Sequence, residues 1–306
     1  FAAVRREFVA RHGSVPGARM GLLGFGKMAS GEMTFTSDLD FILLYDAADS
    51  TIESDGERPL PASQYFARLT QRLVAAISAP TAEGVLYEAD MRLRPSGNAG
   101  PLATSLAAFR AYQAESAWTW ERMALSRARV ILADDGLGDA IAAEIAAALA
   151  LPRDPAAVIA DVVDMRERLT RERPPRHAFD LKLAAGGLVD LEFVAQSAQL
   201  VAGAAIAAPQ APTALVLTRL GETGLLPAGY RLAEIHGVFS AVLQVMSAAL
   251  IEPFRDEGWS DAFRDLLARR TNYPSFSQLA ADLDAMRTEV RAAAAEIERS
   301  MGWDET

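Results

Sequence analysis

The chain has 306 residues and a formal net charge of −10, from 30 basic and 40 acidic residues. This length favours two domains, and the acidic balance argues against a nucleic acid as the main partner. Cysteine is absent and the three histidines lie far apart, which excludes disulfides and the usual zinc sites. No apolar run approaches a membrane span and no signal sequence opens the chain, so we expect a cytoplasmic protein without a membrane partner. The first residue, Phe1, suggests a fragment of a longer polypeptide.

Up to about residue 135, short apolar runs alternate with amphipathic stretches, which is typical of a unit that mixes strands and helices. We expect strands over 20–23, 39–45 and 85–93 and an amphipathic helix over 64–76. The segment 48–63 is rich in Asp, Ser, Gly and Pro, and is typical of an exposed loop that can vary freely.

Two aspartates, Asp38 and Asp40, enter the apolar run that begins at Leu39. Side chains at i and i+2 of a strand share one face, so both carboxylates should point the same way. Carboxylates this close repel unless a cation lies between them, and oxygen ligands suit Mg²⁺ held with substrate phosphates. The glycine-rich turn at 24–31 can bring backbone N–H groups to those phosphates, with Lys27 as either a phosphate-binding cation or an ordinary turn lysine. By itself, an Asp-X-Asp pair is more often a solvated turn.

A third acid, Asp90, follows in the segment that Pro95 ends. Period-2 alternation predicts one polar face, made by Glu88, Asp90, Arg92 and Arg94. The arginines can bind ATP phosphates or pair with the neighbouring acids of a wet edge strand. With the earlier aspartate pair, Asp90 can complete a set of three carboxylates that holds two divalent ions. The order of glycine-rich turn, aspartate pair and third acid is that of a nucleotidyltransferase.

After residue 136 the chain becomes alanine-rich and helical, with Pro and Gly at the breaks. Expected helices are 137–150, 155–172, 188–204, 213–223, 228–252, 260–270 and 275–300. We therefore predict a catalytic domain over 1–135 and an all-α helical-bundle domain over 136–306.

Four aromatic and acidic side chains have two interpretations each. Trp118 and Trp120 are expected to pack in a core rather than to clamp adenine. Asp190 and Glu192 are two residues apart on a predicted helix after Gly186, so they cannot chelate one ion together. Either one of them faces the active site, or they favour the positive helix N-terminus.

Several long segments resemble the glutamine synthetase adenylyltransferase family: 24–45, 87–101, 118–130 and 179–193. Full-length members have one catalytic half that removes AMP by phosphorolysis and one that adds it. The stretch 86–97, with Tyr112-Gln113 and 117–121, is most similar to the C-terminal, adding half. The resemblance implies an α+β fold class: a polymerase-beta-like nucleotidyltransferase domain with a mixed sheet, followed by a helical bundle.

The resemblance also implies an activity and its partners. The activity is the transfer of AMP from ATP to a tyrosine of glutamine synthetase, which releases pyrophosphate and regulates nitrogen assimilation. The partners are glutamine synthetase, the PII signal protein and, as an effector, glutamine. The alternatives are the adenylyl-removing half, which would release ADP, and a catalytically silent binding module.

The site residues follow from the same segments. Asp38, Asp40 and Asp90 are the expected catalytic residues and the ligands of Mg²⁺ or Mn²⁺. The residues expected to bind ATP are Gly24, Gly26, Lys27, Ser37, Arg92 and Arg94.

Overall fold

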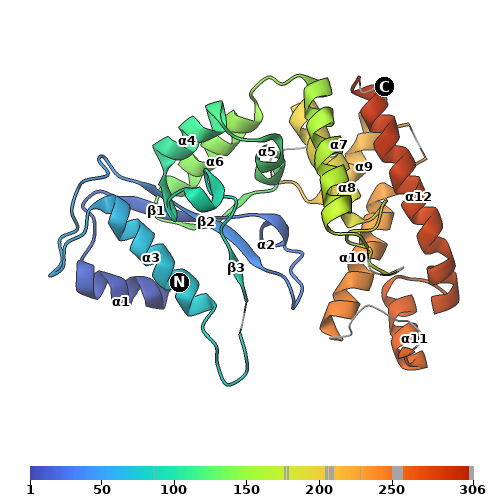
Figure 1. Ribbon diagram of the computed structural model, residues 1–306, viewed down its shortest axis with the longest axis horizontal. Helices are drawn as coiled ribbons and strands as arrows, with labels where there is room; N and C mark the ends of the chain where they lie inside the picture. Colours follow the sequence, from blue (N-terminus) through green and yellow to red (C-terminus); the bar gives the residue numbers. More distant parts are fainter. Residues whose placement is uncertain are drawn as a thin grey trace. The chain divides into compact units, whose positions relative to one another are not determined.

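The computed structural model describes residues 1–85, 87–175, 177, 179–203, 206, 210–227, 229–249 and 258–302. The chain forms two compact units, Phe1–Leu151 and Pro152–Thr306 (Figure 1). The first contains a mixed sheet with helices, and every regular element in the described part of the second is a helix. The expected α+β class is therefore confirmed.

The sheet of the first unit has five strands. β1 (Arg19–Gly24) lies between β2 (Leu39–Asp46) and β5 (Arg129–Ala133) and is antiparallel to both. β2 pairs in parallel with β3 (Ala89–Asp90) and with β4 (Ala103–Ser105). The strands expected over 20–23 and 39–45 are confirmed, and their continuous apolar runs match strands that are buried on both faces.

Helices cover both faces of this sheet (Figure 1). On one face, Phe41, Leu43 and Tyr45 of β2 pack with side chains of α1 (Ala2–His12) and α3 (Ala62–Ile77). The alternate residues of β2, Ile42 and Leu44, pack on the other face with α4 (Leu106–Glu115), α5 (Thr119–Ser126) and α6 (Leu137–Leu149). The short α2 (Gly26–Ser30) follows β1, and a 3₁₀ turn (Gly97–Ala99) precedes β4.

The strand expected over 85–93 is mostly wrong. Only Ala89–Asp90 forms β3, and Leu86 lies outside the described residues. The chain turns after Asp90, where the Arg94 N–H donates to the Met91 carbonyl over 3.2 Å. Arg92 and Arg94 therefore do not continue one polar strand face.

The exposed loop expected over 48–63 is confirmed between β2 and α3, and it is anchored to the end of α1. The Ser14 N–H donates to Asp55 Oδ1 over 2.7 Å, and the Gly56 N–H donates to the His12 carbonyl over 3.1 Å. The two backbones cross so closely that a Cβ on Gly13 would lie 2.3 Å from Gly56 N. A side chain on Gly56 would lie 2.1 Å from the His12 carbonyl carbon. Glycine is thus required on both sides of the crossing.

The second unit is built around α8 (Leu188–Ala202), which packs against four other helices. These are α7 (Pro155–Glu172), α9 (Thr213–Glu222), α10 (Leu232–Ala248) and α12 (Phe276–Ser300). α11 (Asp261–Arg270) packs against α10 and α12. The helices predicted in this region are confirmed, although residues 204, 228 and 250–252 at their expected ends lie outside the described part of the chain.

The division between the units falls after Leu151 rather than at residue 135. α6, which the sequence assigned to the helical domain, packs instead on β5, β1 and α5 of the first unit. The roles expected for the two domains remain predictions. Among the described helices, none combines the length and the apolar character that a membrane span requires.

Candidate active site

The turn between β1 and α2 lies directly against Asp40. The Phe25 N–H donates to the Asp40 carbonyl over 2.8 Å. Gly26 has a φ of +51°, and a Cβ at this position would lie 2.8 Å from Asp40 Oδ2. Glycine therefore allows both the left-handed backbone and the close approach of the carboxylate to the first residue of α2.

Asp90 lies beside Asp40 because β2 and β3 pair in parallel. The register places Asp40 opposite Asp90, and the Leu39 N–H donates to the Glu88 carbonyl over 2.8 Å. Residues in register on adjacent strands share a face of the sheet, so the two carboxylates lie on the same side. Asp38 precedes β2 by one residue and lines the same pocket as Asp90. The structure thus brings the three predicted aspartates to one edge of the sheet.

An open pocket of about 660 Å³ lies at this edge. Asp38, Glu88 and Asp90 give its wall an acidic side, and Arg92 and Arg94 give it a basic one. α3 contributes Gln71, Val74 and Ala75 to the opposite wall. The pocket therefore offers carboxylate oxygens and guanidinium groups to one ligand.

The three aspartates all stabilise the positive charge of Arg92. Its guanidinium forms an ion pair with Asp90, in which Nε donates to Oδ2 over 2.8 Å. The Asp90 hydrogen bond and charge raise the pKa of Arg92, and the charges of Asp40 and Asp38 add to this effect. Burial raises the pKa of Asp90, but the hydrogen bonds from Arg92 together with the charges of Arg92 and Arg94 outweigh it and hold that pKa below its ordinary value.

The donor chemistry of this cluster fits a hard divalent cation. Three carboxylates supply oxygen ligands and negative charge, and Arg92 provides the positive charge that they attract. Within the described residues, no three His, Asp or Glu side chains converge closely enough to hold a metal ion. Since Asp90 is bonded to Arg92, it would have to exchange this partner for the ion.

The other predicted ATP-binding residues have structural contacts of their own. A Cβ on Gly24 would lie 2.8 Å from the Ile131 side chain, so this glycine allows β1 and β5 to pack. The Ser37 hydroxyl accepts from the Thr34 N–H over 2.9 Å and holds the turn before Asp38. Arg94 is buried and donates to the Met91 carbonyl over 2.8 Å. Lys27 is half-buried in α2. Their roles in ATP binding remain predictions.

The family described as glutamate-ammonia ligase adenylyltransferase matches residues 2–144. A bifunctional glutamine synthetase adenylyltransferase/adenylyl-removing enzyme of Mesorhizobium japonicum is 48% identical over 94% of this chain and 29% of its own length. Enzymes of the same name from Brucella suis and Agrobacterium fabrum are 47% and 42% identical, over 95% and 98% of the chain and 30% and 31% of their own lengths. The chain belongs to the glutamine synthetase adenylyltransferase family. It spans about 30% of the length of these relatives.

A second family model matches part of the helical unit of the chain. The family described as GlnD PII-uridylyltransferase matches residues 161–234, which include α8, α9 and most of α7. The two matches lie on either side of the division between the compact units and do not overlap. The sequence comparison and the chain contacts therefore separate the same two parts.

Tyr112 and the segment Trp118–Glu121, both in regions that resemble the adenylyltransferases, form one hydrogen-bonded group around the buried Glu121. Glu121 is 4% exposed and accepts from the Tyr112 hydroxyl and the Trp118 N–H, over 2.9 Å and 2.8 Å. Burial raises the pKa of Tyr112, and the Glu121 contact adds to it. Trp118 and Trp120 are exposed at 68% and 41%, so the expectation that they pack in a core is wrong. The central position of Glu121 in this motif was not predicted from the sequence.

Asp190 in the second unit supports the N-terminus of α8. It forms an ion pair with Arg166 and accepts from the Gly186 N–H just before the helix. Gly186 has a φ of +78°, and a Cβ there would lie 2.1 Å from the Arg287 carbonyl of α12. The paired-glycine motif is thus explained by backbone packing, and Asp190 by the alternative of a stabilised helix N-terminus.

Proposed function

We propose that the chain transfers AMP from ATP to a tyrosine of glutamine synthetase, in a reaction that depends on Mg²⁺ or Mn²⁺. The observation that supports this most is the register of Asp40 with Asp90, at an edge where Asp38 lines the adjoining pocket. Carboxylates on neighbouring strands beside a glycine-rich turn suit a metal-bound nucleoside triphosphate. The names of the relatives supply the acceptor protein.

The aspartates would bind the metal and orient the nucleotide. Asp38, Asp40 and Asp90 would have to move closer together than they are in the structure to hold the ion, with the triphosphate near the turn before α2. The bound ion would neutralise phosphate charge and favour ionisation of the acceptor. A tyrosine hydroxyl has an ordinary pKa of about 10, so a carboxylate of the site would also help to accept its proton. The phenolic oxygen then bonds to the α-phosphorus as the bond to pyrophosphate breaks.

Arg92 would change partners during binding of the nucleotide. In the structure its guanidinium is bonded to Asp90. If Asp90 held a cation, the Arg92 guanidinium in the same pocket would be free to form charge-assisted hydrogen bonds with the negative triphosphate. Arg94, with its hydrogen bonds to the loop backbone, would keep the shape of this wall.

We favour the adding direction because 86–97 and 117–121 are most similar to the adding half. The relatives are named for both adenylyl transfer and removal, so phosphorolysis of AMP-tyrosine to ADP is the second candidate. For the helical unit, we propose docking of glutamine synthetase and regulation through PII and glutamine. This rests on the match of 161–234 to the PII-uridylyltransferase family.

Two parallel reactions test the activity and its direction. The chain is incubated with unmodified glutamine synthetase, Mg²⁺ and α-labelled ATP, and separately with adenylylated glutamine synthetase and phosphate. We expect labelled glutamine synthetase and pyrophosphate in the first reaction and little ADP in the second. Faster ADP release would reassign the chain to the removing half, and inactivity in both would contradict the proposed function.

A further inference from the structure

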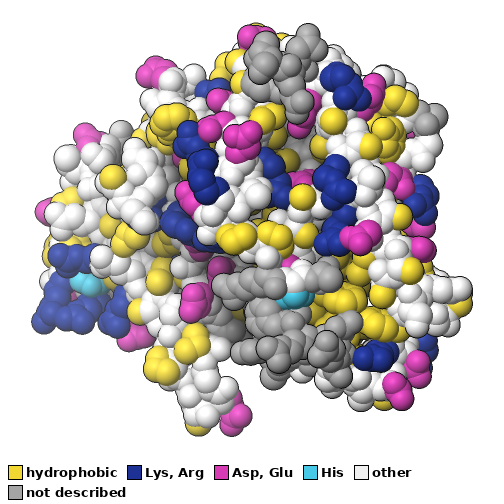
Figure 2. Space-filling view, turned by 45° about the vertical axis from the view of Figure 1, so that its right-hand side comes forward, with side chains coloured by type: hydrophobic (Ala, Val, Ile, Leu, Met, Phe, Trp, Pro, Cys, Tyr) yellow, Lys and Arg dark blue, Asp and Glu magenta, His cyan; other side chains and the backbone are white. Residues whose placement is uncertain are grey.

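A basic groove of about 1170 Å³ lies between α1, the loop before α3, and α3 itself. Figure 2 shows dark-blue side chains gathered around a histidine at the left of the molecule. The basic residues that line the groove are Arg11, His12, Arg58, Arg68 and Arg72. Such a concentration of arginine is unexpected on a chain with a net charge of −10.

The four arginines of the groove form no ion pair among the described residues of the chain. In the same unit, by contrast, Arg5, Arg19, Arg92 and Arg110 each pair with an acid. Glu7 and Glu57 also line the groove, but neither forms an ion pair with an arginine among the described residues. The groove therefore keeps a positive balance that its own acids do not neutralise.

The placement of Arg68 and Arg72 is unfavourable for the isolated helix. The two residues are one turn apart on α3, so their like charges lie one above the other and destabilise the helix. Arg11 and His12 have another explanation, because basic residues in the last turn of α1 favour the helix dipole. No such explanation applies to Arg68 and Arg72, which lie in the middle of α3. An external anion would relieve their repulsion.

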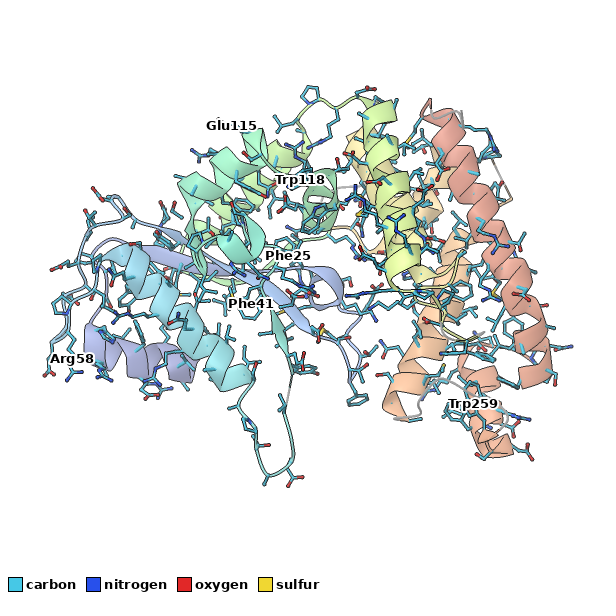
Figure 3. The ribbon with its side chains drawn as sticks, in the orientation of Figure 1. Phe25, Phe41, Arg58, Glu115, Trp118 and Trp259 are labelled. Atoms are coloured by element: carbon cyan, nitrogen blue, oxygen red, sulfur yellow. The ribbon has the colours of Figure 1, made fainter. Side chains whose placement is uncertain are left out.

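The groove is preorganised by contacts between distant segments. His12 Nδ1 lies at hydrogen-bond distance, 2.7 Å, from the Arg58 carbonyl, which places the loop beside the end of α1 (Figure 3). The glycine crossing at Gly13 and Gly56 fixes the same junction. Phe8 and Leu60 form a buried apolar floor. A partner would therefore meet a formed surface with a cationic rim, and little ordering would oppose binding.

The groove adjoins the aspartate pocket along α3. Gln71 and Ala75 line both cavities. The groove and the aspartate pocket are therefore neighbours along α3, so a protein that docks in the groove lies close to Asp38 and Asp90.

We propose that the groove docks an acidic, extended segment of the protein acceptor, next to the tyrosine that receives AMP. This inference rests on the proposed function. The groove is larger than the usual pocket for a small ligand, about 300–1,000 Å³, and combines an apolar floor with exposed arginines. These features suit a polypeptide with Asp or Glu side chains. Electrostatic complementarity at such a rim chiefly sets the orientation and the specificity of binding. An enzyme that modifies one tyrosine of a protein requires both.

The test separates binding from activity. A short fluorescent poly-glutamate peptide is titrated into the wild-type chain, the double variant Arg68→Glu/Arg72→Glu, Arg72→Glu and the control Arg6→Glu. Arg6 is exposed on α1 but does not line the groove, so its reversal changes the net charge as much as Arg72→Glu does. In parallel, the KM values for glutamine synthetase and for ATP are measured for each protein.

We expect the double variant to weaken peptide binding and to raise the KM for glutamine synthetase, each by about tenfold, with the KM for ATP unchanged. The control should stay close to wild type. Equal peptide binding by all proteins would overturn the proposal. So would a rise in the KM for ATP together with tighter binding of tripolyphosphate than of peptide, because the groove would then be a small-phosphate site.

The failure of this proposal is distinguishable from that of the proposed function. If the wild-type chain transfers no AMP but binds the peptide through Arg68 and Arg72, the function is wrong and the acidic-segment site stands. If AMP transfer is normal and insensitive to both charge reversals, the docking proposal alone is overturned.

Discussion

Asp40 on β2 and Asp90 on β3 are paired in register across two parallel strands. This pairing brings together two carboxylates that are far apart in the sequence, and Gly26 leaves room for one of them beside α2. The site thus depends on a very short strand, because β3 consists of Ala89 and Asp90 alone.

The first prediction concerns the aspartate pair. Asp38→Asn and Asp40→Asn should each lower AMP transfer by several orders of magnitude, because loss of a metal ligand removes most of the electrostatic stabilisation of the transition state. Initial rates with labelled ATP measure the effect. Asp135→Asn is the matched control, since Asp135 is exposed and distant in sequence from the cluster. Near-normal turnover of either site variant at ordinary Mg²⁺ concentration would disprove the assignment.

The second prediction concerns the partner of Asp90. Arg92→Gln should bind Mn²⁺ about tenfold more tightly in the absence of nucleotide, because Asp90 no longer has to leave a charged hydrogen-bond partner. Transfer should nevertheless fall, since the pocket loses a cation for the triphosphate. Electron paramagnetic resonance of free Mn²⁺ measures the affinity. Arg110→Gln, which removes the ion pair with Glu144 on α6, is the control. Unchanged or weaker Mn²⁺ binding by Arg92→Gln would show that the ion pair does not compete with a metal.

Much of the fold could be predicted because the relevant signals are local. The apolar runs of β1 and β2 identify buried strands, and the helical periods at 64–76 and 275–300 identify α3 and α12. Asp38 and Asp40 could be found in the same way, since their spacing and the strand that follows are adjacent in the sequence.

The parts that could not be predicted depend on contacts between distant segments. The alternation at 85–93 predicted a long strand, but pairing with β2 ends at Asp90, where the chain turns. The close crossing of Gly13 and Gly56 has no signal in either segment alone. The basic groove was missed for the same reason, because its arginines come from two helices and a loop.

The third prediction tests the buried group around Glu121. Tyr112→Phe should lower the free energy of unfolding by about 2 kcal/mol, because the buried carboxylate loses a hydrogen-bond donor. Denaturant unfolding near neutral pH measures this. Tyr87→Phe is the control, since its hydroxyl forms no hydrogen bond with other described residues. A similar small effect for both substitutions would mean that the Tyr112 contact contributes no stability.

The effect of Tyr112→Phe on the free energy of unfolding should also depend on pH. The folded-state pKa of Tyr112 is raised, first by burial and then by Glu121, above an unfolded value of about 10. The stabilisation is therefore complete below about pH 10 and is lost as the pH rises through the higher folded pKa. The stability difference between wild type and Tyr112→Phe should remain constant at lower pH and shrink above about pH 10.

The last prediction uses two glycines at opposite ends of α2. Gly26 and Gly31 both have positive φ, +51° and +77°, so an alanine at either position should cost about 1 kcal/mol of backbone strain. Only at Gly26 does the added Cβ also meet a predicted catalytic group, 2.8 Å from Asp40 Oδ2, while nothing lies within 4 Å of a Cβ at Gly31.

Gly26→Ala should therefore lower AMP transfer by at least about tenfold, because it displaces the Asp40 carboxylate by part of an ångström, and such misplacement is costly in an active site. Gly31→Ala should lose a similar amount of stability and keep most of its activity. Rates and unfolding free energies are measured for both proteins. If the two variants lose activity equally, strain in α2 explains the effect and the contact with Asp40 does not. If Gly26→Ala alone loses transfer and Mn²⁺ affinity together, the close approach of the turn to Asp40 is what places the metal ligand.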